Sequence, residues 1–274
     1  MKVELIKNIC SQYNLHPSKA RGQNFLIDEN IADKIIDSAD LSNSNVVLEV
    51  GPGLGILTEK LLTKSDNVLA VELDKRSVQY LKTKFQSELK NKKLTLIESD
   101  ALKVDWRKHD LSDFKFKIVA NLPYSITSLF FRQFLEFGPK PSEIIVMIQK
   151  EVAERMLAKV GKMNLLALSA QFFSEPEILF LVGGGSFWPA PEVESAVIRL
   201  RLKTELPEVD IKKMFWLAKM GFASKRKQLK NNLASGLKKN PIVIEGVLNK
   251  LNLRSDIRAQ DLSVANWVDL VGNI

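Results

Sequence analysis

Two short segments of the chain carry groups that could do chemistry on a nucleobase. Residues 46–55 form an apolar stretch that ends in the spacing Gly-x-Gly-x-Gly, and Asn121-Leu122-Pro123-Tyr124 follows about 70 residues later. Glycines directly after a strand let the backbone approach a nucleoside closely. An asparagine beside Pro-Tyr can hold a flat base that carries an exocyclic amine. The two segments together predict a pocket in which a methyl group passes to a nucleobase nitrogen.

The roles expected of the second segment follow from the poor nucleophilicity of an aromatic amine, whose lone pair is delocalised into the ring. The side-chain oxygen of Asn121 and the backbone carbonyl of Leu122 could bond both N–H groups and stabilise the positive charge that develops on the nitrogen. Pro123 would stiffen the turn, and Tyr124 would stack on the base. Because a sulfonium is a good leaving group, alignment can supply most of the rate without a strong general base. The alternative is a structural turn capped by an aromatic residue.

The glycine loop favours a cationic nucleoside cofactor over a dinucleotide. A dinucleotide-binding loop would need glycine at position 56, where this chain has Ile56. A bound phosphate favours a positively polarised helix start, whereas Glu49 comes two residues before Gly51. A carboxylate in that place suits a positively charged ligand better. Taken alone, the loop also fits a common structural turn between a strand and a helix.

Two further predicted strand ends carry acids. The second strand ends in Val71-Glu72-Leu73-Asp74, and an acid there can accept both hydroxyls of a ribose. Asp100, at the end of the following strand, can accept the amino group of an adenine. Without the glycine loop, the acid at the end of the second strand fits a solvated strand end equally well. Together with the glycine loop, the two acids predict S-adenosyl-L-methionine as the cofactor.

These segments can meet only if parallel strands bring their carboxyl ends to one edge of a sheet. Short apolar runs alternate with amphipathic ones along the chain, which is typical of a parallel sheet flanked by helices. Strands are predicted at 46–50, 68–73, 94–98, 116–120, 144–149, 177–182 and 195–202. Helical faces are predicted at 31–39 and 57–62, and a helix at 150–158.

The pattern changes near residue 205. Residues 206–209 look like a linker, and the remainder is helical in composition, with expected breaks at Gly236 and at Asn240-Pro241. We therefore predict an α/β methyltransferase domain over residues 1–204 and a small helical domain over residues 205–274.

Composition limits the classes of function. The chain has 274 residues, 45% of them hydrophobic, and no apolar run long enough to span a membrane. The N-terminus lacks the pattern of a signal peptide. The single cysteine, Cys10, excludes an intrachain disulfide and suits a reducing compartment, so a cytoplasmic protein is expected. With only His16 and His109 beside it, neither a metal site nor a Cys-His nucleophile is expected.

The charge distribution points to a polyanionic partner. The formal net charge is +8, and residues 212–239 hold nine Lys or Arg and no Asp or Glu. Such a run fits either a solvated helical face or a nucleic-acid surface, and the lack of any counter-charge favours the latter. The candidate RNA contacts are Lys225, Arg226, Lys227 and Lys230.

These motifs, in this order, resemble the small-subunit ribosomal RNA adenine dimethyltransferase family, whose bacterial members confer kasugamycin sensitivity. The resemblance covers nearly the whole chain. It includes Gly22-Gln-Asn-Phe-Leu26, Glu49-Val-Gly-Pro-Gly-Leu-Gly55, Glu72-Leu-Asp74, Asp100-Ala-Leu102, Asn121-Leu-Pro-Tyr124, Gln149-Lys-Glu-Val-Ala-Glu-Arg155, residues 186–197, Phe222-Ala-Ser-Lys-Arg-Lys-Gln-Leu229 and Arg258-Ala-Gln-Asp-Leu262.

The resemblance implies a class I methyltransferase fold with a seven-stranded, mostly parallel sheet and a helical C-terminal domain. It implies cofactor contacts at Asn24, Leu26, Gly51, Glu72, Asp100 and Asn121. It also implies that Phe187 sandwiches the target adenine against Tyr124, although a Phe in this context is more often a core residue. The expected reaction is dimethylation at N6 of two neighbouring adenines near the 3′ end of 16S rRNA. The expected partner is an immature small ribosomal subunit, and a monomer could suffice.

The chain departs from the family pattern in two places. Trp188 stands where the family usually has Tyr, and residues 159–169 differ from the commoner Tyr-Gly-x-Leu-Ser pattern. The second departure is a candidate for shaping RNA entry.

Three other functions remain as alternatives. The nearest is a relative that modifies a large-subunit adenine and confers macrolide resistance, but such enzymes usually depart from Gly-Pro-Gly-Leu-Gly and often have Ile at the position of Leu122. A non-catalytic RNA-binding factor would not need Asn121, Pro123, Tyr124 and Glu72. A nicotinamide oxidoreductase is disfavoured by the glycine spacing.

Overall fold

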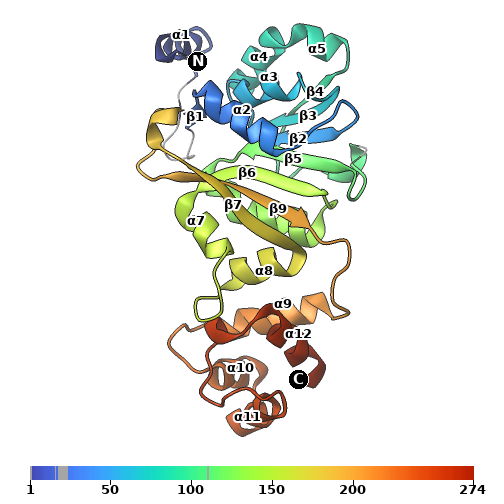
Figure 1. Cartoon of the computed structure of the whole chain (residues 1–274), viewed down its shortest axis with the longest axis vertical. Helices are drawn as coiled ribbons and strands as arrows, with labels where there is room; N and C mark the ends of the chain where they lie inside the picture. The colour runs from blue at the N-terminus through green and yellow to red at the C-terminus, as the bar shows by residue number, and fades with distance from the viewer. Residues whose placement is uncertain (1, 16, 18–23, 110) are drawn as a thin grey trace. The chain divides into compact units, whose positions relative to one another are not determined.

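The computed structural model of the chain describes residues 2–15, 17, 24–109 and 111–274 (Figure 1). The chain forms two compact units. The sheet unit comprises Met1–Ala153 and Glu175–Leu202, and the helical unit comprises Glu154–Ser174 and Lys203–Ile274. The predicted functional division at residue 205 stays a prediction. Residues 154–174 pack with the helical unit, as the ring stacking of Phe173 on Phe215 illustrates.

A seven-stranded sheet forms the centre of the sheet unit. Its strand order is β4-β3-β2-β5-β6-β9-β7, and the pairs β4–β3, β3–β2, β2–β5 and β5–β6 are parallel, whereas β9 is antiparallel to β6. The strands are β2 (Val46–Val50), β3 (Asn67–Glu72), β4 (Leu94–Glu98), β5 (Phe116–Asn121), β6 (Glu143–Gln149), β7 (Ser174–Val182) and β9 (Ser195–Leu202). The predicted class, mostly parallel α/β with seven strands, is confirmed.

Helices and turns precede this sheet or connect its strands. They are α1 (Val3–Gln12), α2 (Glu29–Ser38), α3 (Ile56–Leu61), α4 (Lys75–Lys84), α5 (Gln86–Lys90), η2 (Trp106–Lys108), η3 (Tyr124–Ile126), α6 (Thr127–Arg132), the π-helical turn η4 (Gln133–Phe137), α7 (Lys150–Met156) and η5 (Gly184–Ser186). Side chains fix where several begin: Asp28 accepts the N–H groups of Asn30 and Ile31 at the start of α2, and Asp74 accepts that of Arg76 at the start of α4.

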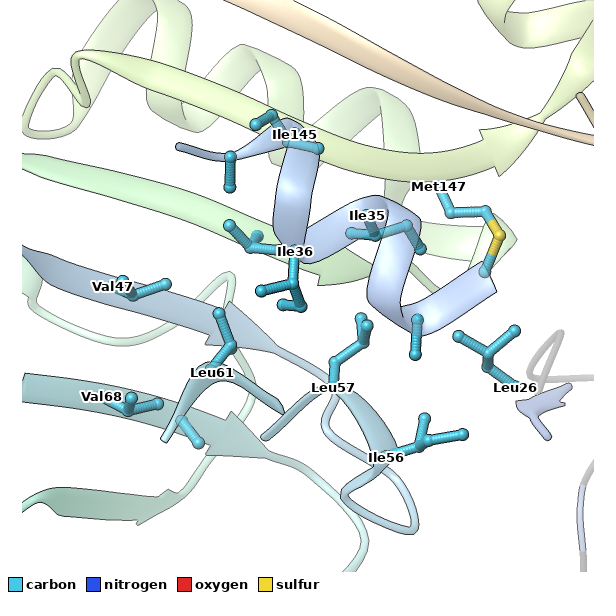
Figure 2. Close-up of a cluster of buried hydrophobic side chains, with 14 of the residues drawn as sticks. Leu26, Ile35, Ile36, Val47, Ile56, Leu57, Leu61, Val68, Ile145 and Met147 are labelled. Carbon is cyan, nitrogen blue, oxygen red and sulfur yellow. The ribbon is translucent and has the colours of Figure 1, made fainter. Parts of the chain in front are cut away.

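One face of the sheet packs against α2 and α3. Ile35 and Ile36 of α2 form one buried cluster with Leu57 and Leu61 of α3 and Val47 of β2, all of them labelled in Figure 2. Alternate strand residues point to the opposite face, where Leu48, Ile118, Ile144 and Val146 are buried equally well. Because both faces are covered, the strands read in the sequence as continuous apolar runs.

A short antiparallel pair was not predicted. β1 (Phe25–Leu26) pairs with β8 (Phe187–Trp188), with Phe25 opposite Trp188 and Leu26 opposite Phe187. Two-residue strands carry too little pattern to be recognised in a sequence, and these two lie far apart in the chain. Their pairing places residues 24–26 beside the carboxyl ends of the central strands.

The helical unit consists of α8 (Leu165–Phe173), α9 (Ile211–Gly221), α10 (Leu229–Leu237), α11 (Pro241–Lys250), η6 (Ala259–Asp261) and α12 (Val264–Asn273). The expected break at Asn240-Pro241 is confirmed, since Asn240 caps α11. The break expected at Gly236 is wrong, because α10 runs through it to Leu237. A β-carbon at Gly236 would lie 2.6 Å from the Met220 sulfur, so this glycine serves close helix packing instead.

Within the residues described, no helix is both long and apolar enough to cross a bilayer.

Gly221→Ala is expected to destabilise the helical unit. A β-carbon there would lie 2.5 Å from Cη2 of Trp267 and 2.9 Å from Cδ1 of Leu229, and both side chains are fully buried. Overpacking of this kind costs roughly 1–3 kcal/mol. Gly246→Ala, in an exposed part of α11 with open space around it, is the matched control and should stabilise by up to about 1 kcal/mol. Denaturant midpoints measure both, and equal midpoints for the two variants would contradict the packing argument.

Candidate active site

A cavity lies in the sheet unit at the carboxyl ends of β2, β3 and β5. Its lining residues are Asn24, Phe25, Leu26, Glu49, Gly51, Pro52, Gly53, Leu54, Ile56, Leu57, Glu72, Ser77, Asn121, Leu122, Pro123 and Tyr124. Both segments singled out in the sequence therefore face one pocket, and eight of the ten predicted catalytic and cofactor positions line it. Asp100 and Phe187 are absent from this lining.

The glycine loop comes close to both neighbouring segments. Gly51 has φ +71°, and a β-carbon there would lie 3.4 Å from the ring of Pro123, so the cofactor loop and the Asn-Leu-Pro-Tyr turn are in contact. Gly53 has φ +57°, and a β-carbon there would lie 3.0 Å from the Phe25 ring. Positive φ favours glycine at both positions, and at Gly53 the close approach of the Phe25 ring favours it further.

Glu72 joins the glycine loop to the end of β3. Its Oε2 accepts the N–H of Gly53 at 3.0 Å and its Oε1 accepts the N–H of Asp74 at 2.9 Å. The carboxylate is 7% exposed. Burial raises its pKa, and the backbone hydrogen bonds oppose that rise. A carboxylate oxygen can accept more than one hydrogen bond. Of the two acids in Glu72-Leu73-Asp74, Glu72 lines the pocket, whereas Asp74 caps α4.

Asn121 is held by a neighbouring backbone group. Its Nδ2 donates to the carbonyl of Asn24 at 3.2 Å, and this bond identifies which end of the side-chain amide is nitrogen. The other amide atom, Oδ1, can therefore accept a hydrogen bond from a ligand. The N–H of Leu122 donates to the carbonyl of Met147 on β6 at 3.1 Å, which ties the turn to the sheet.

Tyr124 is fixed at its hydroxyl. The phenol oxygen and the Oγ of Ser195 share a hydrogen bond of 2.7 Å, and Ser195 is fully buried at the start of β9. Burial raises the pKa of Tyr124, against the effect of the Ser195 bond. The phenol therefore stays neutral, and its ring is available for stacking rather than its oxygen for base catalysis.

Glu49 is a second buried carboxylate in the pocket. It is 1% exposed, and its Oε2 accepts the hydroxyl of Thr58 at 2.7 Å. Burial is the main cause that raises its pKa to about 8, and the nearby Glu72 adds to the rise. The sequence marked Glu49 as suited to a cationic ligand but did not place it among the site residues. Ser77, buried in the first turn of α4, also lines the pocket, and its sequence context gave no signal.

The N-terminal helix packs beside this pocket. Phe25 and Leu54, both lining residues, belong to a hydrophobic cluster with Ile6, Ile9 and Cys10 of α1. Cys10 is therefore a core residue, and burial raises the pKa of its thiol. His16, like Gly22 and Gln23 of the first motif, lies outside the described residues.

Two predicted site residues lie away from the lining. Asp100 lies two residues after the end of β4. Its Oδ1 accepts the N–H of Leu102 at 3.0 Å, and its Oδ2 lies 3.9 Å from Nζ of Lys103. Phe187 is 3% exposed and belongs to the core cluster that also contains Leu26 and Met147. The predicted sandwich of adenine between Phe187 and Tyr124 stays a prediction.

The candidate RNA contacts lie in the helical unit, around a basic turn at residues 224–228. Lys225, Arg226 and Lys227 are exposed there. The buried amide of Asn232 fixes the start of the turn by donating to the carbonyls of Gly221 and Ser224, at 2.6 and 3.0 Å. Lys230 differs from the other three: its Nζ lies 2.8 Å from Glu245, and its side chain is 19% exposed.

Known proteins resemble this chain over nearly its full length. Residues 15–270 match the family described as Ribosomal RNA adenine dimethylase. A Ribosomal RNA small subunit methyltransferase A from Dehalococcoides mccartyi (strain CBDB1) is 42% identical over 269 residues, which cover 96% of this chain and 90% of the relative. A relative of the same name from Alkaliphilus oremlandii (strain OhILAs) is 38% identical over 279 residues, covering 98% and 95% of the two chains.

Solved structures share the fold. A dimethyladenosine transferase from Plasmodium falciparum superposes with a TM-score of 0.76 at 27% identity, over 90% of this chain and 95% of that one. The 23S rRNA methyltransferase ErmE superposes with a TM-score of 0.70 at 24% identity, over 91% and 99%, a likeness that concerns the fold alone. The family match spans the glycine loop, both buried carboxylates and the Asn-Leu-Pro-Tyr turn. The chain belongs to the ribosomal RNA adenine dimethylase family.

Proposed function

We propose that the protein transfers methyl groups from S-adenosyl-L-methionine to N6 of two adjacent adenosines near the 3′ end of 16S rRNA and dimethylates both. The observation that carries this proposal is the bond from Asn121 Nδ2 to the Asn24 carbonyl. It leaves Oδ1 as the acceptor for one N–H of an adenine amine, and the carbonyl of Leu122 would accept the other. Two acceptors in those places stabilise positive charge on the attacking nitrogen.

The residues of the pocket fit S-adenosyl-L-methionine, the methyl donor of this family. When bound, it supplies an electrophilic methyl group on a sulfonium. Glu72 would accept the ribose hydroxyls in addition to the backbone N–H groups of Gly53 and Asp74. Glu49 would provide negative charge for the cationic ligand, because a nearby positive charge favours the ionised form of a carboxyl. Gly51 and Gly53 would let the backbone lie against the nucleoside.

Tyr124 would position the base. Its hydroxyl bond to Ser195 holds the ring at the pocket wall, where it could stack on an adenine that has left its helix. Unstacking a base costs a few kcal/mol in a duplex and less in an unpaired loop. The catalytic groups at Asn121, Leu122, Pro123 and Tyr124 would thus align and hold the amine rather than deprotonate it.

The RNA partner would be recognised mainly through its backbone. Lys225, Arg226 and Lys227 project from a turn of the helical unit, and phosphate contacts by such side chains dominate affinity. Names of the curated relatives favour the small subunit as substrate. We further propose an immature small subunit as the physiological partner, a cytoplasmic location and action as a monomer.

Two alternatives remain to be tested. The first is an enzyme that methylates a large-subunit adenine, but the Gly-Pro-Gly-Leu-Gly loop and Leu122 favour the small-subunit reaction. A 23S rRNA methyltransferase is among the structures with this fold. A non-catalytic RNA-binding factor would not need the Asn121 amide to be held in this orientation. Transfer of labelled methyl to unmodified small subunits, compared with large subunits, separates all three functions.

Asn121→Ala should lower methyl transfer by roughly 100-fold or more, by analogy with the loss of one charge-stabilising group from an active site. Cofactor affinity should fall much less than transfer, because Asn121 is only one of several residues expected to contact the cofactor, whereas it supplies one of the two acceptors for the base amine. Asn249→Ala, on the exposed surface of α11, is the matched control. Single-turnover transfer to unmodified small subunits measures the effect. Unchanged transfer by Asn121→Ala would refute the proposed mechanism.

Glu49→Gln should stabilise the protein more strongly at high pH than at low pH. The folded-state pKa of Glu49 is raised to about 8 from an ordinary 4.5, so the unfolded chain releases this proton at lower pH than the folded protein. The wild type therefore loses stability as the pH rises between these values, and Gln removes that loss. Urea unfolding at about pH 5 and about pH 8 measures the difference. The exposed Glu154→Gln serves as control, and a pH-independent gap between wild type and Glu49→Gln would contradict the assignment.

Reversing the charge of Lys225 and Lys227 should weaken RNA binding and flatten its salt dependence. Each RNA phosphate that the protein no longer neutralises lowers the slope of log affinity against log salt by roughly 0.7–0.9. Methyl transfer at saturating RNA should persist, because neither side chain belongs to the pocket. Affinity for a 16S rRNA transcript across a salt series tests this, and an unaltered slope would remove the basic turn from the RNA surface.

A further inference from the structure

A second loop of the helical unit is fixed to the turn before α12. Residues 157–163, which join α7 to α8, carry two N–H groups that bond one carbonyl. Gly161 donates to the carbonyl of Gln260 at 2.9 Å, and Met163 donates to the same oxygen at 3.2 Å. The side chain of Met163 is buried, which anchors the end of the loop. This 157–163 loop includes the start of the segment that departs from the family pattern.

The basic turn is fixed to the same part of the chain. Leu229, the residue after this turn, donates its N–H to the carbonyl of Ile257 at 2.8 Å. Ile257 and Gln260 are three residues apart, and Arg258 lies between them. The 157–163 loop, residues 257–260 and the basic turn therefore lie side by side within one compact unit.

This arrangement gathers cations that are far apart in the sequence. Lys159 and Lys162 of the loop are exposed, as are Arg258 and the three cations of the basic turn. Among the ion pairs of the described residues, none involves Lys159 or Lys162. The carboxylates nearest in sequence to Arg258 are already engaged: Asp256 lies 3.2 Å from Arg254, and Asp261 accepts the Arg258 N–H at 3.1 Å.

The loop also presents an open, pre-formed edge. Gly161 has φ +94°, and no atom lies within 4 Å of the place where its β-carbon would be. Val160, between the two lysines, is 58% exposed. Because backbone bonds already hold the loop, little ordering of its chain opposes binding.

We propose that Lys159 and Lys162 bind phosphates of the same rRNA that the basic turn contacts, so that the 157–163 loop is a second part of the RNA surface. The inference rests on the proposed function, since it takes the RNA substrate as given. It adds residues outside the acid-free run that first pointed to RNA. Continuity with the basic turn favours an RNA backbone over an acidic protein as the ligand.

The test uses the full-length chain with Lys159→Glu and Lys162→Glu combined. The control combines Lys82→Glu and Lys90→Glu, exposed lysines of the sheet unit, which change the net charge equally. The probes are a protein-free transcript of the 3′ segment of 16S rRNA and unmodified small subunits. Affinity for the transcript should fall about tenfold or more at moderate salt, with a salt slope reduced by roughly 0.7–0.9 for each phosphate released. Lys159→Arg with Lys162→Arg should retain binding, and cofactor affinity should not change.

Each other outcome overturns the inference in a distinct way. A loss no greater than that of the Lys82/Lys90 control shows that the 157–163 loop does not meet RNA. Weaker binding to subunits with unchanged binding to the transcript assigns the loop to a ribosomal protein instead. The proposed function itself fails separately, if the wild-type protein transfers no methyl group to small subunits.

Discussion

The carboxylate of Glu72 bonds two loops at once, and the pocket depends on that arrangement. One oxygen holds the glycine loop that follows β2, and the other holds the turn that begins α4. Parallel pairing of β3 with β2 in register is what brings the two loops within reach. With Gly53 held there, its backbone lies under the ring of Phe25, and the neighbouring Gly51 lies against Pro123. A buried carboxylate is costly unless its acceptor sites are filled. Here the backbone N–H groups of Gly53 and Asp74 donate to the carboxylate, and under the proposed function the ribose hydroxyls would add further donors.

Much of the fold could be predicted because buried parallel strands are apolar throughout. β2, β4 and β9 begin and end at the predicted residues, and the other strands differ by a few residues at their ends. Features that depend on partners distant in the chain could not be found this way. The β1–β8 pair joins two-residue strands. Gly236 does not end α10, and its lack of a side chain makes room for Met220. In both cases tertiary packing determines the local structure, and the surrounding sequence shows no pattern that reveals it.

The site shows the same division. Residue types at strand ends predicted the pocket, because a sheet edge brings those ends together, and Glu72, Gly51 and Asn121 all line it. The burial of each residue and its partners in the folded protein could not be predicted from the sequence. Glu49 is fully enclosed with a raised pKa, a property of burial that a sequence does not carry. Lys230 was grouped with its basic neighbours, yet α11 supplies Glu245 as its partner. Phe187 has a core position, as aromatic residues flanked by apolar strands usually do.

The pairing of β1 with β8 has a consequence for the newly made polypeptide. Phe25, a wall of the pocket, pairs with Trp188, and both contact the cluster that includes α1. During translation the first helix emerges long before residue 188, so its apolar face has no complete surface to cover until most of the sheet unit has been synthesised. Contacts between such distant residues form late, since long loops must close first. The nascent chain would therefore complete this wall of the pocket only after residue 188 has been synthesised, and until then the apolar face of α1 would stay exposed.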